Sequence, residues 1–354
     1  MTPPSIYQML KSQARSTPHQ AAIIAPHRLG YGQDRPEIKN LSLYQHHSWP
    51  ARHPANLLGA NKLGANRRPL TYLRLWQHVQ DTINQLNQLG IGRHDKVAIV
   101  LPNGPEMAVA FLSITAAAIC APLNPACRRS EYDFYLSNLE AKALVILAGM
   151  ESPVLAVAQA RNIPIITLSP RINEEAGLFT LSGSQRPITS SIGPAQADDV
   201  ALVLYTLDPP DRAKLMSLTQ RNLNIAAINI QQILQLMPQD RCLNIMPLFH
   251  IHGLVGAMLS SISAGAGVVC MPSFYPPHFF DWLHNYQPTW YTATPTVHQA
   301  ILAEADKHQE VISQTRLRFI HSASSLSPQM RQQLEDVFKA PVIDAYSNKL
   351  HIQF

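Results

Sequence analysis

The sequence predicts an α/β protein built from two αβ subdomains whose sheets are mostly parallel. Apolar runs of strand length recur along the 354 residues, for example at residues 97–101, 143–147 and 200–205. These runs are continuous rather than alternating, which is typical of strands that are buried on both faces. Segments with helical spacing of apolar residues separate them, and a helix is the usual connection between parallel strands. The length is also consistent with about two domains.

The first half of the chain alternates helices and strands. Residues 6–26 contain a helix and then a short apolar strand. Thr71 is a suitable cap for a helix that Gly90 ends. The apolar run at residues 107–121 lies between two prolines, is too short to span a membrane, and predicts a buried helix. The other expected elements are a strand at 97–101, a helix opening at 130–133, and strands at 143–147 and 163–168.

Two segments lack a regular pattern. Residues 30–68 are rich in Asn, His, Gly, Arg and Pro, with no period of 2 or 3.6, which predicts a long loop or a disordered insert. Residues 169–198 are rich in Ser, Pro, Gly and Thr, which indicates a connection. We therefore divide the chain into a first subdomain at residues 1–185, with the insert at 29–68, and a second at residues 186–354.

The second half repeats the alternation of strands and helices. A long helix is expected where apolar residues follow a 3.6-residue period after Thr219. The expected strands are 200–205, 241–246, 267–271, 290–293 and 318–321, and the expected helices are 219–237, 254–264, 279–286, 296–305 and 328–338.

Charge and cysteine usage exclude several classes of function. The formal net charge is +5, and the basic residues are scattered, so no nucleic-acid partner is expected. The four cysteines form no C-x-x-C pair, and no His/Cys cluster has zinc spacing, so we expect buried reduced thiols and no metal site. The N-terminus lacks a basic region followed by an apolar one. We expect a cytoplasmic protein with no membrane span.

A strand, a polar turn and a helix meet at residues 205–223. Such a junction commonly holds a nucleotide phosphate with backbone N–H groups and a helix N-terminus. The segment resembles the ATP-binding loop of the acyl-CoA synthetase, adenylation-domain and luciferase superfamily, Y-T-S-G-T-T-G-x-P-K-G-V followed by L-T-H-x-N-L. The matching residues are Tyr205, Thr206, Lys214, Leu218, Thr219, Asn222 and Leu223.

The centre of this loop departs from the family pattern. Ser, Gly, Thr, Thr, Gly, Pro and Gly are replaced by Leu207, Asp208, Pro209, Pro210, Asp211, Ala213 and Leu215. Glycine allows the backbone to approach a phosphate closely. The two prolines remove N–H donors, and the two aspartates add negative charge where ATP brings more. Lys214 remains as a cation, and a solvated surface lysine is the alternative interpretation.

Residues 246–254 read M-P-L-F-H-I-H-G-L and resemble the P-L-F-H-x-x-G segment of the same family. The resemblance implies that His250 lies beside the acyl carboxylate, where a neutral imidazole can orient it by a hydrogen bond. We assign His252 to the same side of the site. The alternative is a core histidine that is bonded to a backbone carbonyl.

Two further segments, residues 288–299 and 321–328, are similar to segments found in one branch of this superfamily. That branch contains oxalate–CoA ligases and fatty-acyl-CoA synthetase-like proteins. In the first segment the strand and loop help line the acyl pocket of that branch, but we expect its Trp290 and Tyr291 to be core residues.

The second segment resembles R-S-x-S-S-P-L-x-P, which implies that Ser322 and Ser324 reach the substrate. His321 stands in place of the arginine, and one residue is missing before Leu326.

Residues 342–350 resemble a segment that usually continues Y-G/A-x-T-E. The resemblance implies that Tyr346 stacks on adenine. Lys349 aligns with the threonine that binds the α-phosphate, and Leu350 aligns with the glutamate that holds Mg²⁺, which a leucine cannot ligate. Relatives continue with a small C-terminal domain that carries a catalytic lysine, and we expect that domain to be absent.

The family reaction joins a carboxylate to AMP, using ATP and Mg²⁺, and then passes the acyl group to CoA. Because the loop and the Mg²⁺ position depart from the pattern, we expect a ligase-like protein that is impaired or inactive, with ATP and Mg²⁺ binding in doubt. The alternative is a non-catalytic module that binds a small carboxylic or acyl ligand or a protein partner. The candidate nucleotide-binding residues are Thr206, Lys214, Thr219 and Tyr346, and the candidate acyl- or carboxylate-binding residues are His250, His252, Ser322 and Ser324. No catalytic or metal-ligating residue is assigned.

Overall fold

The computed structural model describes residues 5–26, 67–187, 191–205 and 214–344, and within them the chain forms two seven-stranded sheets. In the first sheet, neighbours are parallel except for the antiparallel pairs at its two edges. Its order is β7 (Phe179–Ser182), β6 (Ile165–Pro170), β5 (Ala143–Leu147), β3 (Lys96–Val100), β4 (Ile119–Pro122), β8 (Val200–Tyr205) and β9 (Leu215–Thr219).

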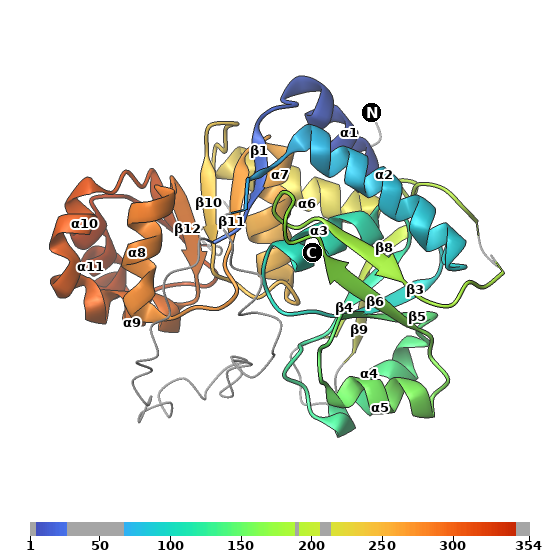
Figure 1. The fold of residues 1–354 in the computed structure, drawn as a ribbon. Helices are drawn as coiled ribbons and strands as arrows, with labels where there is room; N and C mark the ends of the chain where they lie inside the picture. The colour runs from blue at the N-terminus through green and yellow to red at the C-terminus, as the bar shows by residue number, and fades with distance from the viewer. Residues whose placement is uncertain (1–4, 27–66, 188–190, 206–213, 345–354) are drawn as a thin grey trace.

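The second sheet combines strands from the two ends of the described chain. Its neighbours are parallel except for the antiparallel pair at one edge. Its order is β14 (Val342–Asp344), β13 (Phe319–Ser322), β12 (Trp290–Ala293), β10 (Arg241–Asn244), β11 (Gly267–Cys270), β1 (Ala21–Ile24) and β2 (Leu70–Thr71). Figure 1 shows β12 toward one side of the molecule and β6 toward the other. The predicted fold class, α/β with two mostly parallel sheets, is confirmed.

One group of helices lies between the two sheets and contributes to a core cluster that contains residues of both. These helices are α1 (Ile6–Ser16), α2 (Tyr72–Gln88), α3 (Pro105–Thr115), α6 (Gln220–Ile233), the π-helix η3 (His252–Leu259) and α7 (Ser260–Ser263). The first sheet is also flanked by α4 (Arg129–Leu139) and α5 (Pro153–Ala160).

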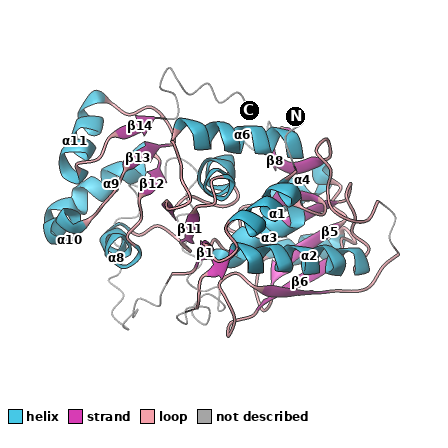
Figure 2. Ribbon diagram, turned by 90° about the horizontal axis from the view of Figure 1, so that it is seen from above, coloured by secondary structure: helices cyan, strands magenta, loops and turns pink. Residues whose placement is uncertain are grey.

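A second group of helices packs against β12–β14, and helices and strands together form a separate apolar cluster. Figure 2 shows these helices around the three strands at one end of the molecule. They are α8 (Pro276–Tyr286), α9 (Pro295–Ala305), the 3₁₀ turn η4 (Asp306–His308), α10 (Gln309–Gln314) and α11 (Pro328–Phe338).

Five short strands were not predicted, among them β2 (Leu70–Thr71) and β14 (Val342–Asp344) at the two edges of the second sheet. The run at residues 107–121 is not one helix, because α3 ends at Thr115 and β4 begins at Ile119, where it pairs with β3. The segment predicted as a bare connection contains β7, and β9 precedes the helix that follows Thr219. An apolar run buried on all sides has no period that separates helix from strand, and two-residue alternation in a four-residue edge strand is a weak signal.

The predicted boundary at residue 185 does not coincide with the division between the sheets. Strands β8 and β9 follow residue 185 but hydrogen-bond into the first sheet, whereas β1 and β2 precede it and belong to the second. The division into domains at that residue therefore stays a prediction.

Most of the predicted insert at residues 29–68 lies outside the described residues. Of its two described residues, Arg68 is exposed, whereas Arg67 is only 7% exposed and pairs with the buried carboxylate of Glu106. Its guanidinium also donates to the carbonyl of Glu175 at 2.8 Å. A buried charge needs such partners, and they fix the chain where regular structure resumes.

Other sequence expectations can be checked directly. All four cysteines are free thiols, and three of them are buried. Trp290 and Tyr291 are fully buried, as expected for core residues. None of the helices in the described ranges is long and apolar enough to cross a bilayer.

Candidate functional site

A row of polar residues crosses the second sheet near the carboxyl ends of its parallel strands. Asn244 of β10, Thr292 of β12 and His321 of β13 are partners in register and are 0–2% exposed. Two residues earlier on the same strands lie Cys242, Trp290 and Phe319, which join the apolar core on the face covered by η3. Because side chains alternate along a strand, the polar row points to that same face.

The row continues into the π-helix through His252, and this chain of hydrogen bonds is called the histidine relay below. His252 Nε2 lies 2.6 Å from Thr292 Oγ1, which lies 2.9 Å from His321 Nδ1. The two imidazole rings are stacked, with centroids 5.4 Å apart and planes 4° apart. Thr292 therefore holds the two histidines in a fixed relative position.

Both relay histidines are neutral at physiological pH. Burial lowers the pKa of His252 to about 4. Burial, with the repulsion of His252 and His298, lowers the pKa of His321 well below its usual value. A neutral ring has one N–H and one lone pair, and the threonine hydroxyl has one proton. It follows that Thr292 donates to at most one of the two rings and accepts from at least one, which limits the tautomers that the pair can adopt.

His250 lies on the turn between β10 and η3. Its Nε2 atom is buried and has no hydrogen-bond partner within the described chain, and burial lowers its pKa to about 4. The side chain of Asn103, from the loop after β3, fixes this turn. It accepts from the Leu248 N–H at 2.8 Å and donates to the carbonyls of Met246 and Met271 at 3.3 and 2.9 Å.

The turn and the π-helix approach each other closely because position 253 is a glycine. A Cβ atom at Gly253 would lie 2.2 Å from the Pro247 carbonyl oxygen. A Cβ at Gly256 would lie 3.1 Å from His252 Nδ1. The family-like segment therefore needs Gly253 for packing, and π-helical turns such as η3 are frequent at functional sites.

The substitution Gly253→Ala is expected to destabilise the protein by about 2 kcal/mol or more, measured by urea unfolding. Alanine favours a helix over glycine by about 1 kcal/mol, but the new methyl group overlaps a backbone oxygen that cannot rotate away. Gly149→Ala is the control, because no atom lies within 4 Å of the place that its Cβ would occupy and only the left-handed backbone is strained. Equal losses in the two variants would contradict the close-packing argument.

Three buried nitrogen atoms at this edge of the sheet have no partner within the described chain: Asn244 Nδ2, His250 Nε2 and His321 Nε2. A buried polar atom without a hydrogen bond costs about 1–3 kcal/mol, so such atoms usually meet a water molecule or a ligand. Asn244 and His321 lie at the carboxyl ends of β10 and β13 and His250 lies on the turn that follows β10, so this edge is the candidate ligand site, called the carboxyl-edge site below.

The two predicted serines lie where β13 ends. Ser322 is buried and donates to the carbonyl of Ser324 at 2.6 Å, while Ser324 is half-buried. Ser322 therefore shapes the loop after β13, and the four predicted acyl-side residues, His250, His252, Ser322 and Ser324, all belong to the carboxyl edge of one sheet. Their role in binding stays a prediction.

The predicted nucleotide residues are only partly described. Thr206 and Tyr346 lie outside the described residues, as do the replaced residues 207–211 and 213. Strands β8 and β9 form the antiparallel hairpin that holds both ends of this loop, with Tyr205 opposite Leu215. Lys214 is exposed at the loop end of the hairpin.

Thr219 lies at the other end of the hairpin, opposite Val200. Its hydroxyl accepts from the Asn222 N–H at 3.1 Å and caps α6. The four residues of strand between it and the loop end correspond to roughly 13 Å. The structure thus gives Thr219 a capping role and does not bring it to the loop end.

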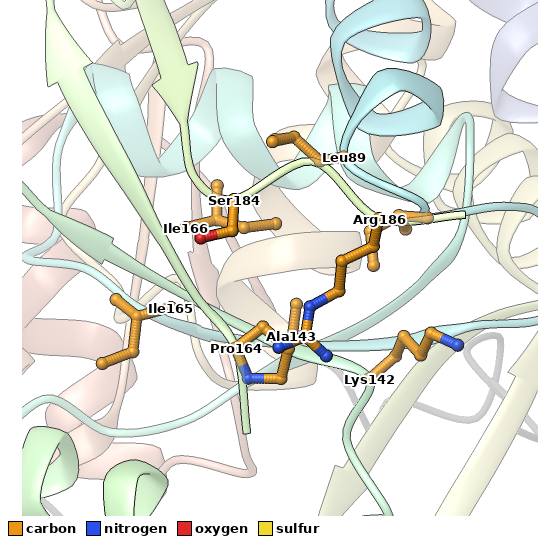
Figure 3. A pocket seen from close by; sticks show the side chains of 9 residues that line it. Leu89, Lys142, Ala143, Pro164, Ile165, Ile166, Ser184 and Arg186 are labelled. Carbon is orange, nitrogen blue, oxygen red and sulfur yellow. The ribbon is translucent and has the colours of Figure 1, made fainter. Parts of the chain in front are cut away.

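A small cavity lies at the amino ends of β5 and β6, at the opposite end of these strands from their carboxyl ends. Lys142, Pro164, Ser184 and Arg186 contribute to its wall (Figure 3). Its volume of about 10 Å³ has room for a single water molecule. It cannot hold an acyl chain or a nucleotide.

Sequence reasoning missed Asn244, Thr292 and the relay role of His321. The sequence contains one indication of them. Each lies two residues after an apolar residue on a predicted strand, and so on the same face of that strand. A single sequence does not reveal the register of strands that are about 30–50 residues apart, so it could not show that these residues are neighbours.

Comparisons with known proteins agree with this architecture. A family described as AMP-binding enzyme matches residues 48–347. Oxalate–CoA ligase of Arabidopsis thaliana is 35% identical over 284 residues, covering 78% of this chain and 55% of that protein. Oxalate–CoA ligase of Saccharomyces cerevisiae is 34% identical over 279 residues, covering 72% and 51%.

The fold is also similar to that of a solved structure, the inhibitor-bound N-terminal domain of FACL13 from Mycobacterium tuberculosis. The TM-score is 0.71 at 17% identity, covering 97% of this chain and 76% of that one. The chain spans about half the length of the curated relatives that it matches.

Proposed function

The chain belongs to the AMP-binding enzyme family, and we propose that it is an acyl-CoA synthetase-like protein that binds a carboxylic acid at the carboxyl-edge site but supports little or no carboxylate adenylation. The ancestral reaction is ATP-dependent adenylation of the acid followed by thioester formation with CoA. What remains in this chain is acyl binding without efficient activation of the acid.

The observation that carries the proposal is the contrast between the two halves of the site. At the carboxyl edge, His250, Asn244 and the relay present buried, unpartnered nitrogen atoms that suit an acid. At the β8–β9 hairpin, the connecting residues include Asp208, Pro209, Pro210 and Asp211 where the family has glycines and threonines.

This donor set does not fit ATP and Mg²⁺. Two prolines supply no N–H group, and two carboxylates repel a polyphosphate. Lys214 alone supplies one point charge, and removal of a single transition-state contact can cost about 10²–10³ in rate. We therefore assign no adenylation step to these residues.

Calorimetric titration separates acid binding from nucleotide binding. We expect no heat of binding for ATP with Mg²⁺ up to about 1 mM, and saturable binding of at least one straight-chain carboxylic acid in the absence of ATP. The matched control is His250→Phe, which should weaken acid binding because it removes the unpartnered Nε2 while keeping an aromatic ring beside Phe249. Micromolar, Mg²⁺-dependent ATP binding would contradict the proposal.

A further inference from the structure

The sheet edges of the described chain differ in how their outward backbone groups are covered. An edge strand directs alternate N–H and C=O groups away from its one neighbour, and an uncovered row of them can pair with another chain. Natural proteins therefore shorten such strands, cover them or place charged residues on them. The edge strands here are β7 and β9 of the first sheet and β14 and β2 of the second.

Three of these edges are protected. At β7, the side chain of Gln85 on α2 accepts a hydrogen bond from the N–H of Leu181 at 3.0 Å. At β14, Glu335 of α11 accepts from the N–H of Val342 at 3.0 Å, and Arg331 donates to the carbonyl of the same residue. Strand β2 has only two residues and leads directly into α2. Little of these edges is open to a partner.

Strand β9 lacks such protection within the described ranges. It pairs with β8, and no described side chain or other backbone segment forms a hydrogen bond with the backbone of its first four residues. The strand reads L-M-S-L-T and contains no charged residue and no proline, the residue types that discourage pairing at an edge. Leu215 is 39% exposed, and Ser217 is exposed as well. This is the most open sheet edge in the described part of the chain.

The sequence of β9 is complementary to a second copy of itself. Antiparallel pairing about a two-fold axis centred on Ser217 sets Leu215 opposite Thr219 of the other copy. It also sets Met216 opposite Leu218, and both of these side chains pack in the core of the first sheet. Core-facing residues thus meet core-facing residues across the axis, and all five positions of the strand are paired.

The charges at the ends of the strand are compatible with this pairing. Lys214 precedes β9 and is exposed. Gln220 follows β9, and its N–H donates to the carbonyl of Asp199. The neighbouring Asp198 pairs with Arg221 but keeps 82% of its side chain exposed. The two-fold pairing therefore brings Lys214 of each copy toward Asp198 of the other, and opposite charges favour the encounter.

We propose that the open edge of β9 is a dimerisation surface, at which two copies of this chain pair as antiparallel strands and join their first sheets into one. Two five-residue strands bury less than the roughly 1,200 Å² of a stable interface. The dimer is accordingly weak, with a dissociation constant on the order of 10–100 µM. The surface is separate from the carboxyl-edge site, so the inference does not depend on acid binding.

Sedimentation velocity of the full chain between about 1 and 300 µM tests the proposal. The weight-average mass is expected to rise with concentration toward twice the mass of the monomer. Hydrogen exchange followed by mass spectrometry at the two ends of this range locates the contact. The amides of β9 are expected to exchange more slowly in the concentrated sample than in the dilute one.

Three variants separate β9 from the other edge of the same sheet. Ser217→Lys sets two like charges opposite each other at the axis and is expected to weaken association at least about tenfold. Ser217→Thr keeps a neutral residue that favours strands and should preserve association. Thr180→Lys adds the same charge at an exposed position of the covered edge strand β7 and should associate like the unaltered protein.

Two results would overturn the proposal. One is a monomer over the whole concentration range; slow exchange of its β9 amides would then show that another segment of the same chain covers this edge. The other is a dimer that Ser217→Lys leaves unchanged and whose β9 amides exchange equally at both concentrations, because its contact would lie elsewhere. The concentration dependence of exchange in the unaltered protein decides the question even if Ser217→Lys does not fold.

Discussion

Between pH 6.5 and pH 5 the protein is expected to lose several kcal/mol of stability. Burial, with the positive charges of Arg171 and Arg74, lowers the pKa of His78 to about 4, and burial lowers the pKa of His298 to about 4. Burial, with the repulsion of His252 and His298, also lowers the pKa of His321 well below its usual value. These three side chains are at most 3% exposed.

The sign follows from the unfolded state, in which a histidine has a pKa of about 6.5. As the pH falls below that value, the unfolded chain binds protons and the folded chain does not, so the free energy of unfolding decreases. The contribution is complete above pH 6.5 and is lost as the pH falls toward 4. At pH 5 each histidine costs about 2 kcal/mol, and three of them approach the whole stability of an ordinary domain, about 5–15 kcal/mol.

Urea unfolding at pH 8, 7, 6, 5.5 and 5 measures this loss, and its slope gives the number of protons taken up on unfolding. His78→Gln is the matched control, because His78 packs on Phe179 of β7 rather than on the relay. In that variant the free energy of unfolding should depend less steeply on pH, by the contribution of one histidine, and the contributions of the other histidines should remain. A free energy of unfolding that stays constant from pH 8 to pH 5 would show that these histidines are not held neutral by the fold.

Replacement of the phosphate-loop residues is expected to raise the affinity for ATP by at least about tenfold. The variant carries the family residues at the seven departing positions: Leu207→Ser, Asp208→Gly, Pro209→Thr, Pro210→Thr, Asp211→Gly, Ala213→Pro and Leu215→Gly. It adds N–H donors at positions 209 and 210 and hydroxyls at positions 207, 209 and 210, removes two negative charges, and gives up one N–H at position 213. The β8–β9 hairpin that anchors the loop is already in place, and of the seven changes only Leu215→Gly falls within a strand, at the first residue of β9.

Two simpler variants separate the causes. Asp208→Asn with Asp211→Asn tests charge alone and should give part of the gain. Leu215→Gly alone changes an exposed position of β9 opposite Tyr205 and should give none. ATP affinity that is unchanged in the sevenfold variant would mean that the loop is not what limits nucleotide binding.

The strands of both sheets were largely predictable, because β3, β5, β8 and β12 are continuous apolar runs between polar turns. Strand β9 was not, because its burial alternates weakly and it is an edge strand whose partner is β8 alone. Strand β4 follows α3 after only three residues, and no polar residue marks the change.

The candidate site was predictable only where the chain resembles a family segment. The P-L-F-H segment indicated His250 and His252, but the partners that hold His252 come from β12 and β13, 40 and 69 positions later. These residues come together only because the strands pair in parallel in one register and because Thr292 points to the face that His252 covers. Neither the register nor the face can be read from the residues next to each of them in the sequence. His321 was visible as a substitution for arginine, and only the structure shows that it completes a relay.

Carboxylate-dependent exchange of pyrophosphate into ATP tests the central claim, that the acid-binding half of the site persists without efficient adenylation. The assay uses the full chain with Mg²⁺, ATP and a series of straight-chain carboxylic acids, and an active CoA ligase of the same family is run in parallel as a positive control. Exchange is expected at the level of the enzyme-free background with every acid, while at least one acid binds by calorimetry. Exchange well above background that depends on any of the acids would contradict it.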